Sequence, residues 1–389
     1  MSTPGSLAPD PISTLLVAME SIWRDSPQKP LEHVSHVIGS RFYGFLDALA
    51  TLCAFAPQCD AAAAVMGCER NDGRLYISVK PVASPELRVL VQELLDLVKS
   101  LPDTTPSTVL GVSEGFDVET FKSLDMATPD HQIIISIYRA CHAKFRVCAT
   151  RCRALLTDLP KRGQRGFRDE WDTLSEKLNY LLDVASRDVD EVSDAEFLGL
   201  YYTVDDVLRS TMPMRKVLPS IVYSAMQRLE PLPRAVRTIL AMARKERRVA
   251  RHWDVCWIDS SATQTFRASV DEDYIRTNFG VVADKSIVWP PPETLEKDPE
   301  PTSQCVTGLA VVHPEAALLD YVWQHKVNVS GHIGVSPPTC YPCFMLLWAF
   351  NAQQVQLPHP SPLVSSGYDG RRSPKDFQRC SGGRLYHDC

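Results

Sequence analysis

The sequence predicts an α/β fold combined with a large all-helical region. Residues 61–80 carry the apolar alternation of a strand pair, interrupted by the turn sequence Asn-Asp-Gly. Residues 305–350 read as strand, helix, strand and helix with short connections, which is typical of an α/β unit. Between these segments, residues 85–252 repeat apolar side chains at three- and four-residue spacing, which predicts several helices.

The composition is that of an ordinary globular protein and excludes some classes of function. The chain has 389 residues, 44% hydrophobic and 23% charged, enough for two or three domains or one domain with a large insertion. A formal net charge of −6 argues against a protein that coats nucleic acid over its whole surface. The longest apolar runs are too short to cross a bilayer, and the N-terminus carries no secretory signal. We therefore expect a cytoplasmic or nuclear protein with no membrane partner.

The N-terminal third is expected to contain helices on either side of a β-hairpin. Residues 1–60 predict two helices, because apolar side chains recur at helical spacing from residue 12 to residue 57. The hairpin of residues 61–80 follows. The next helix should begin just after Ser84, because a serine cap, Pro85 in the first turn and the acidic Glu86 together form a helix start signal.

The helical region is expected to extend to residue 252. Its further helices are predicted at residues 132–159, 167–186, 194–210, 214–229 and 234–251. Prolines and acids in residues 289–304 forbid regular structure, so this segment is expected to be an exposed loop. Two basic clusters, residues 161–168 and 243–253, are suited to guiding a phosphate backbone, and equally to forming a solvated surface.

Two short motifs near the C-terminus carry the candidate chemistry. Proline suits the first position of a helix, so Pro314 places His313 near the N-cap and Glu315 in the first turn. In the same way Pro342 can begin a helix, which places Cys340 and Cys343 around a second helix N-terminus.

The two motifs together predict a zinc site. The positive end of a helix lowers the pKa of a thiol, and zinc binds thiolates. A Cys-x-x-Cys pair beside a histidine supplies three of four tetrahedral ligands, here His313, Cys340 and Cys343. The fourth position is then open to water, whose pKa the metal lowers. Glu315, two residues from the histidine, is the candidate for moving the proton.

These residues resemble a known family. His313-Pro314-Glu315, followed by Cys340-Tyr341-Pro342-Cys343, is similar to the H-x-E and C-x-x-C signature of the cytidine deaminase superfamily. The longer stretches "HPEAALLDYV" and "HIGVSPPTCYPC" look like the fungal branch of OTT-type deaminase-like proteins. The close resemblance covers about 40 residues around these two motifs.

The resemblance implies a particular organisation of the chain. It implies a three-layer core, a mixed sheet with helices on both faces, whose first strands are the hairpin of residues 61–80. The helices of residues 85–252 would then be an insertion and residues 253–358 the deaminase-like core, with an irregular tail at 359–389.

The resemblance also implies an activity, the hydrolytic deamination of a cytosine- or adenine-type base in a nucleoside, RNA or DNA. Glu315 would take a proton from water and return it to the leaving ammonia. Lys80 stands near the end of the second strand, where members of the superfamily usually carry a substrate-contacting Asn. We assign substrate contact to Lys80, Ser336 and Tyr341, the last by stacking on the base.

Three other interpretations remain open at this stage. The first is a catalytically inactive, zinc-stabilised module of the same fold that binds protein partners through its helical region. The second is a thioredoxin-like redox dithiol formed by the cysteine pair. The third is a helical scaffold in which the motifs arise by chance.

Overall fold

The structure is a computed structural model. It describes residues 41–67, 73–100, 121, 124–157, 168–211, 229–245, 253–260, 263–269, 296–297, 305–336, 343, 346–347, 350–351 and 364–365. The first predicted N-terminal helix and nearly all of the one predicted at 214–229 lie outside these residues, as do most of both basic clusters.

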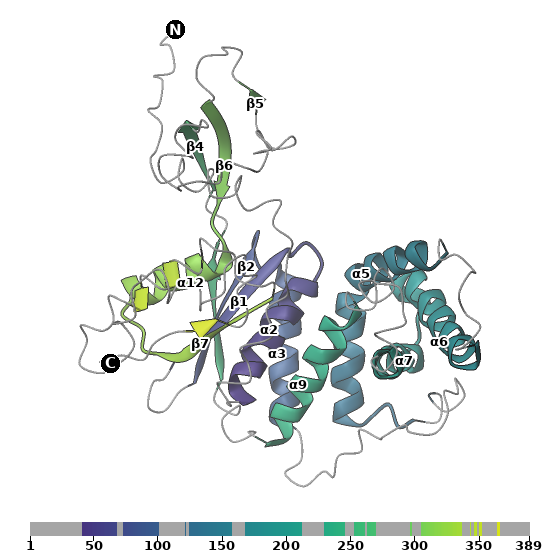
Figure 1. The fold of residues 1–389 in the computed structure, drawn as a ribbon. Helices are drawn as coiled ribbons and strands as arrows, with labels where there is room; N and C mark the ends of the chain where they lie inside the picture. The colour runs from purple at the N-terminus through teal and green to yellow at the C-terminus, as the bar shows by residue number, and fades with distance from the viewer. Residues whose placement is uncertain are drawn as a thin grey trace, which may run out of the picture.

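A mixed five-strand sheet lies at the centre of the molecule (Figure 1), with the strand order β3-β2-β1-β7-β8. Its bounds are β1 Ala61–Gly67, β2 Arg74–Lys80, β3 Asp254–Asp259, β7 Val329–Val335 and β8 Val364–Ser365. Strand β1 pairs antiparallel with both β2 and β7, whereas β2–β3 and β7–β8 are parallel pairs. The predicted hairpin is confirmed, with Ala61 opposite Lys80 and Met66 opposite Leu75.

Both faces of the sheet are covered by helices, so the fold has three layers. Helix α2 (Arg41–Phe55) lies on the face that carries Ala62, Ala64 and Ile77, and α12 (Pro314–Gln324) lies on the face of Ala63 and Val65. Successive side chains of a strand point to opposite faces, which explains why β1 is apolar at consecutive positions. The predicted α/β class is therefore confirmed, with helices on both sides of a mixed sheet.

Helix α2 approaches β7 unusually closely at Gly334. A Cβ atom built on Gly334 would lie 2.2 Å from the carbonyl carbon and 2.4 Å from the carbonyl oxygen of Leu46. Such distances are shorter than any van der Waals contact, and backbone atoms cannot rotate away. Only glycine therefore lets this helix reach the strand.

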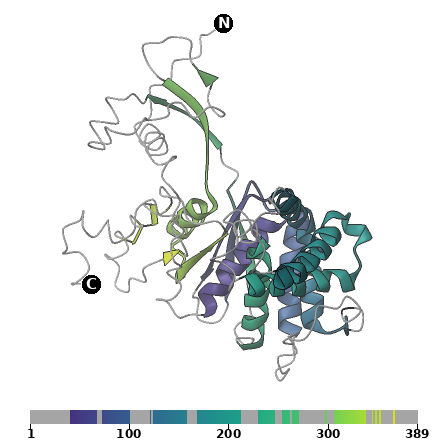
Figure 2. The ribbon, with the colours of Figure 1, turned by 45° about the vertical axis from the view of Figure 1, so that its right-hand side comes forward.

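The remaining helices pack on the α2 side of the sheet (Figures 1 and 2). They are α3 Pro85–Ser100, α5 Pro129–Thr157, α6 Arg168–Ser186, the short 3-10 helix η2 Val189–Glu191, α7 Asp194–Thr211 and α9 Pro231–Lys245. The predicted start of α3 is confirmed, since Ser84 Oγ accepts the N–H of Leu87 at 3.2 Å. Within the part of the chain that the structure describes, no helix is long and apolar enough to cross a membrane.

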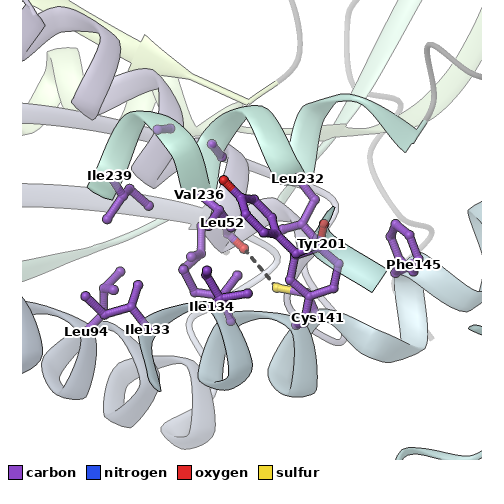
Figure 3. Close-up of a cluster of buried hydrophobic side chains, with 14 of the residues drawn as sticks. Leu52, Leu94, Ile133, Ile134, Cys141, Phe145, Tyr201, Leu232, Val236 and Ile239 are labelled. Carbon is purple, nitrogen blue, oxygen red and sulfur yellow. Dashed lines mark hydrogen bonds between the residues drawn. The ribbon is translucent and has the colours of Figure 1, made fainter. Parts of the chain in front are cut away.

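The helical region shares one apolar core with this face of the sheet (Figure 3). Ile134 and Cys141 of α5 lie beside Leu52 of α2 and Ile239 of α9, all of them fully buried. The Cys141 thiol donates to the carbonyl of Leu52 at 3.9 Å. The core therefore runs without interruption from the sheet into the helices.

A second, three-stranded antiparallel sheet has the order β4-β6-β5. Its strands are β4 Thr263–Ser269, β5 Glu296–Lys297 and β6 Cys305–Val311. The predicted order of strand, helix and strand from residue 305 is confirmed, but β6 does not enter the main sheet. It pairs with β4 instead, and the two strands extend away from the main sheet in both views (Figures 1 and 2).

Strands β3 and β4 were not predicted from the sequence, and two shorter strands lie in segments that were expected to be irregular. Strand β5 falls within the proline-rich segment 289–304, and β8 falls within the expected irregular tail, residues 359–389. Each has two residues, too few for the alternation by which a strand is recognised in a sequence. Strand β8 extends the main sheet by pairing with His332 and Ile333 of β7.

Candidate metal centre

The N-terminus of α12 presents the first two residues of the site. His313 is the N-cap residue, with extended φ and ψ angles of −73° and 148°, and its carbonyl accepts the N–H of Ala317 at 3.0 Å. Pro314 follows as the first helical residue, where its missing N–H costs nothing. The imidazole makes no capping hydrogen bond and is directed instead to Cys343. Glu315 lies in the first turn, as predicted.

Cys343 lies beside these residues in space but follows β7 in the sequence, whereas His313 and Glu315 precede that strand. It is helical and buried, as are Leu347 and Phe350 one and two turns later. These two side chains belong to the same apolar cluster as Leu318 of α12, so both helices pack on one face of the sheet. This shared packing brings two residues that are 30 positions apart into contact.

The three side chains form one compact group. His313 Nδ1 lies 3.4 Å from Cys343 Sγ, and the ligand atoms of His313, Glu315 and Cys343 all lie within 4.8 Å of one another. A histidine nitrogen, a carboxylate oxygen and a thiol sulfur at such separations could hold a metal ion. The predicted ligands His313 and Cys343 are thus brought together, whereas Cys340 lies outside the described residues.

Burial differs among the three groups. Glu315 is 6% exposed and Cys343 is 5% exposed, whereas His313 is exposed. A carboxylate removed from water needs compensation by hydrogen bonds, by an opposite charge or by a metal. The N-terminal end of α12 supplies part of that compensation through its positive dipole. The group therefore combines a buried carboxyl group and a buried thiol with an imidazole at the protein surface.

The sequence assigned Glu315 to proton transfer and not to metal binding. In the structure its carboxylate belongs to the same group of ligand atoms as His313 and Cys343. With Cys340 the site would offer four ligand side chains, which is enough to close a tetrahedral centre.

Two of the predicted substrate residues, Lys80 and Ser336, lie at one end of the main sheet. Ala62 at the start of β1 is joined to Ser336 by two bonds: its N–H donates to Ser336 Oγ at 2.9 Å, and its carbonyl accepts the N–H of Ser336 at 3.0 Å. The hydroxyl of Ser336 thus fastens β1 to the end of β7. Lys80 is half-buried at the end of β2, opposite Ala61. Tyr341 lies outside the described residues.

Sequence reasoning missed a polar pair behind the site. His332 of β7 and Asp47 of α2 are bonded through Nε2 and Oδ1 at 3.0 Å, and the Tyr43 ring stacks on the imidazole at 4.6 Å. The two residues are 285 positions apart in the sequence, so no local sequence pattern predicts their contact. The sequence contains one indication of the pair: Asp47 lies on the apolar side of a helix, where burial of an unbonded carboxylate is unfavourable in free energy.

Comparisons with known proteins give no relative for this chain. No protein-family model matches it, and searches of curated proteins and of solved structures found no match.

Proposed function

We propose that the protein is a zinc-dependent hydrolytic deaminase of a cytosine- or adenine-type base. The observation that carries the proposal is the contact of His313 Nδ1 with Cys343 Sγ at 3.4 Å, beside the buried carboxylate of Glu315. A tetrahedral zinc ion with bonds of about 2.0 Å to nitrogen and 2.3 Å to sulfur keeps those two ligands about 3.5 Å apart. The two side chains are therefore already at the separation that zinc requires.

The ligand types favour zinc over other common metals. Calcium and magnesium take oxygen ligands, whereas a thiolate with an imidazole is the ligand pair of zinc sites. Cys340, three residues before Cys343, is the expected third ligand. Bound there, zinc would lower the pKa of a water molecule and so supply a nucleophile near neutral pH.

The arrangement of the elements supports the resemblance to the deaminase superfamily. The two motif-bearing helical segments pack on one face of the sheet and are separated in sequence by a single strand, β7, which pairs with the hairpin strand β1. The hairpin supplies strands to the same sheet, as the resemblance implied. The helices from α3 to α9 then form an insertion between β2 and the motifs.

Glu315 is the expected proton carrier. It is held in the first turn of α12, where the helix end favours its charged form, and burial keeps it out of bulk water. Glu315 would take one proton from the attacking water and pass it to the ring nitrogen of the cytosine or adenine. It would then pass the remaining hydroxyl proton of that water to the amine, which leaves as ammonia. Lys80 and Tyr341 remain the proposed substrate contacts; Ser336 is a weaker candidate because its hydroxyl accepts the N–H of Ala62.

The decisive experiment compares Glu315→Gln with Cys343→Ala. Zinc content is measured in the purified proteins, and ammonia release is measured on cytidine, adenosine and single-stranded RNA and DNA. The wild type should hold about one zinc and turn over at least one substrate. Glu315→Gln should keep the metal and lose about 10²- to 10⁴-fold in rate, and Cys343→Ala should lose the metal. Cys148→Ala, a half-buried cysteine of α5, is the matched control and should change neither.

One observation favours a second function, a zinc-stabilised interaction module. If the Glu315 carboxylate, which lies within the ligand group, binds the metal, then His313, Glu315, Cys340 and Cys343 make a closed site of the structural kind. Glu315→Gln would then lower zinc content and thermal stability together, and no substrate would be turned over. A folded wild type without zinc would overturn both functions.

A further inference from the structure

The end of β7 is the anchor from which the chain leaves for the cysteine motif. Neighbouring N–H groups of a strand point to opposite sides, and that of Ser336 points to β1, where it reaches the carbonyl of Ala62. The N–H of Val335 therefore points to the other side. Strand β8 lies on that side, where its two described residues pair with His332 and Ile333.

The N–H of Val335 is bonded by Asp47 of α2. Its Oδ1 atom accepts the N–H of Val335 at 3.3 Å and lies 3.0 Å from Nε2 of His332. One carboxylate oxygen thus holds two points of the same strand, and the Tyr43 ring covers the imidazole. The close approach at Gly334 brings the Asp47 backbone to this position, because a Cβ there would lie 2.5 Å from Asp47 N.

The strand end is consequently fixed from both sides, by Asp47 from the helix and by Ala62 from β1. Cys343 follows Ser336 by seven residues, and Cys340 by four. We expect a displacement of the strand end to change where this segment begins and so to shift Cys343. The metal ligands are sensitive to such displacement, because a tetrahedral site tolerates only small errors in ligand position.

We propose that Asp47 is a positioning residue for the metal centre, acting through the end of β7 on the segment that carries Cys340 and Cys343. The proposal rests on the metal site of the proposed function and goes beyond it by assigning a role to the opposite face of the sheet. Asp47 belongs to α2, whereas the ligands His313 and Glu315 lie at the start of α12 on the other face of the sheet. Its effect is on where the cysteine segment begins.

The test measures the zinc dissociation constant, by competition with a chelator, together with thermal stability. Asp47→Ala removes the acceptor and should weaken zinc binding about 10-fold or more, by comparison with other groups that orient ligands. Asp47→Asn keeps an Oδ1 acceptor in the same place and should bind zinc within about 3-fold of the wild type. Ile134→Ala, in the core of the helical region, is the control that lowers stability without touching β7.

Each outcome has a definite meaning. Weaker zinc binding in Asp47→Ala, with Asp47→Asn and Ile134→Ala near the wild-type value, supports the positioning role. Equal affinity in Asp47→Ala and the wild type overturns it and leaves the metal site intact. Equal weakening in Asp47→Ala and Ile134→Ala also overturns it, since the effect would then follow stability alone. A wild type that binds no zinc overturns the proposed function, and this inference with it.

Discussion

The two faces of the main sheet differ in what covers them. One face meets α2 and continues into the helical region, where a single apolar core includes side chains from α3, α5, α6, α7 and α9. Among the described residues, the other face meets α12 and the helical residues Leu347 and Phe350, in a cluster with far fewer members. The candidate metal group lies on this thinner side. Stability and chemistry are thus assigned to opposite faces, with β1 and β7 shared between them.

The difference has a physical reason. Burial of apolar surface contributes about 25 cal/mol per Å², so the larger core supplies most of the folding free energy. A thin layer can then hold polar ligands at a helix end and still leave His313 exposed for access. We expect substitutions on the two faces to separate loss of stability from loss of metal binding.

The largest expected loss of stability is that of Gly334→Ala, at the contact between α2 and β7. The added methyl group would lie within 2.5 Å of three backbone atoms of α2, and relief requires the helix to move off the strand. We expect a loss of about 3 kcal/mol or more in the free energy of unfolding, measured by urea denaturation.

The matched control is Gly44→Ala on the same helix. A Cβ at Gly44 would meet Thr238 Cγ2 at 3.5 Å, an ordinary contact, and alanine is the better helix former. This variant should be neutral or more stable by up to about 1 kcal/mol. If Gly334→Ala were as stable as Gly44→Ala, the close approach of α2 to β7 would be wrong.

A second prediction compares Ile134→Ala with Leu318→Ala, one from each face. Both side chains are fully buried, so each truncation should cost about 2–5 kcal/mol. Ile134 belongs to the core that α2 shares with the helical region, whereas Leu318 belongs to the other cluster and lies one turn after Glu315 on α12. Only Leu318→Ala should weaken zinc binding, as measured by chelator competition. Equal zinc affinities in the two variants would contradict the division between the faces.

The sequence predicted the local elements well because their signals are local. The hairpin follows from Asn-Asp-Gly and the start of α12 from Pro314, and both are found where expected. The order of the strands in the two sheets was harder to predict from the sequence. Strand β6 looked like a strand of the main sheet, but nothing in its own residues distinguishes pairing with β4 from pairing with β1.

The candidate site was likewise predictable where its residues belong to local motifs, and not where it depends on packing. His313 and Cys343 belong to recognisable motifs, and their contact at 3.4 Å agrees with the pairing that the motifs suggested. The inclusion of Glu315 in the ligand group depends on side-chain direction, and the bond of Asp47 to His332 depends on the packing of α2 against β7. The spacing of residues along the chain predicts neither of these contacts.

The smallest expected effect is acid sensitivity on the helical side, at His142 of α5. The side chain is 2% exposed and its Nε2 has no hydrogen-bond partner among the described residues. Burial lowers the pKa of His142 below its ordinary value of 6.5, and the nearby Arg146 and Arg187 lower it further. Asp188 and the carbonyl of Val184 act in the opposite direction, with smaller effect than burial.

The sign of the pH dependence follows from that direction. Because the folded protein holds the His142 proton less tightly than the unfolded chain, its contribution to stability is complete above about pH 6.5 and is lost as the pH falls through the lower pKa of the folded state. The free energy of unfolding should therefore decrease between pH 7 and pH 5, by urea denaturation followed through helical circular dichroism. His142→Leu should flatten this decrease. The difference in free energy of unfolding between the two proteins at pH 8 measures the change in packing alone and is subtracted. A variant with the same slope as the wild type would show that the acid sensitivity arises from groups other than His142.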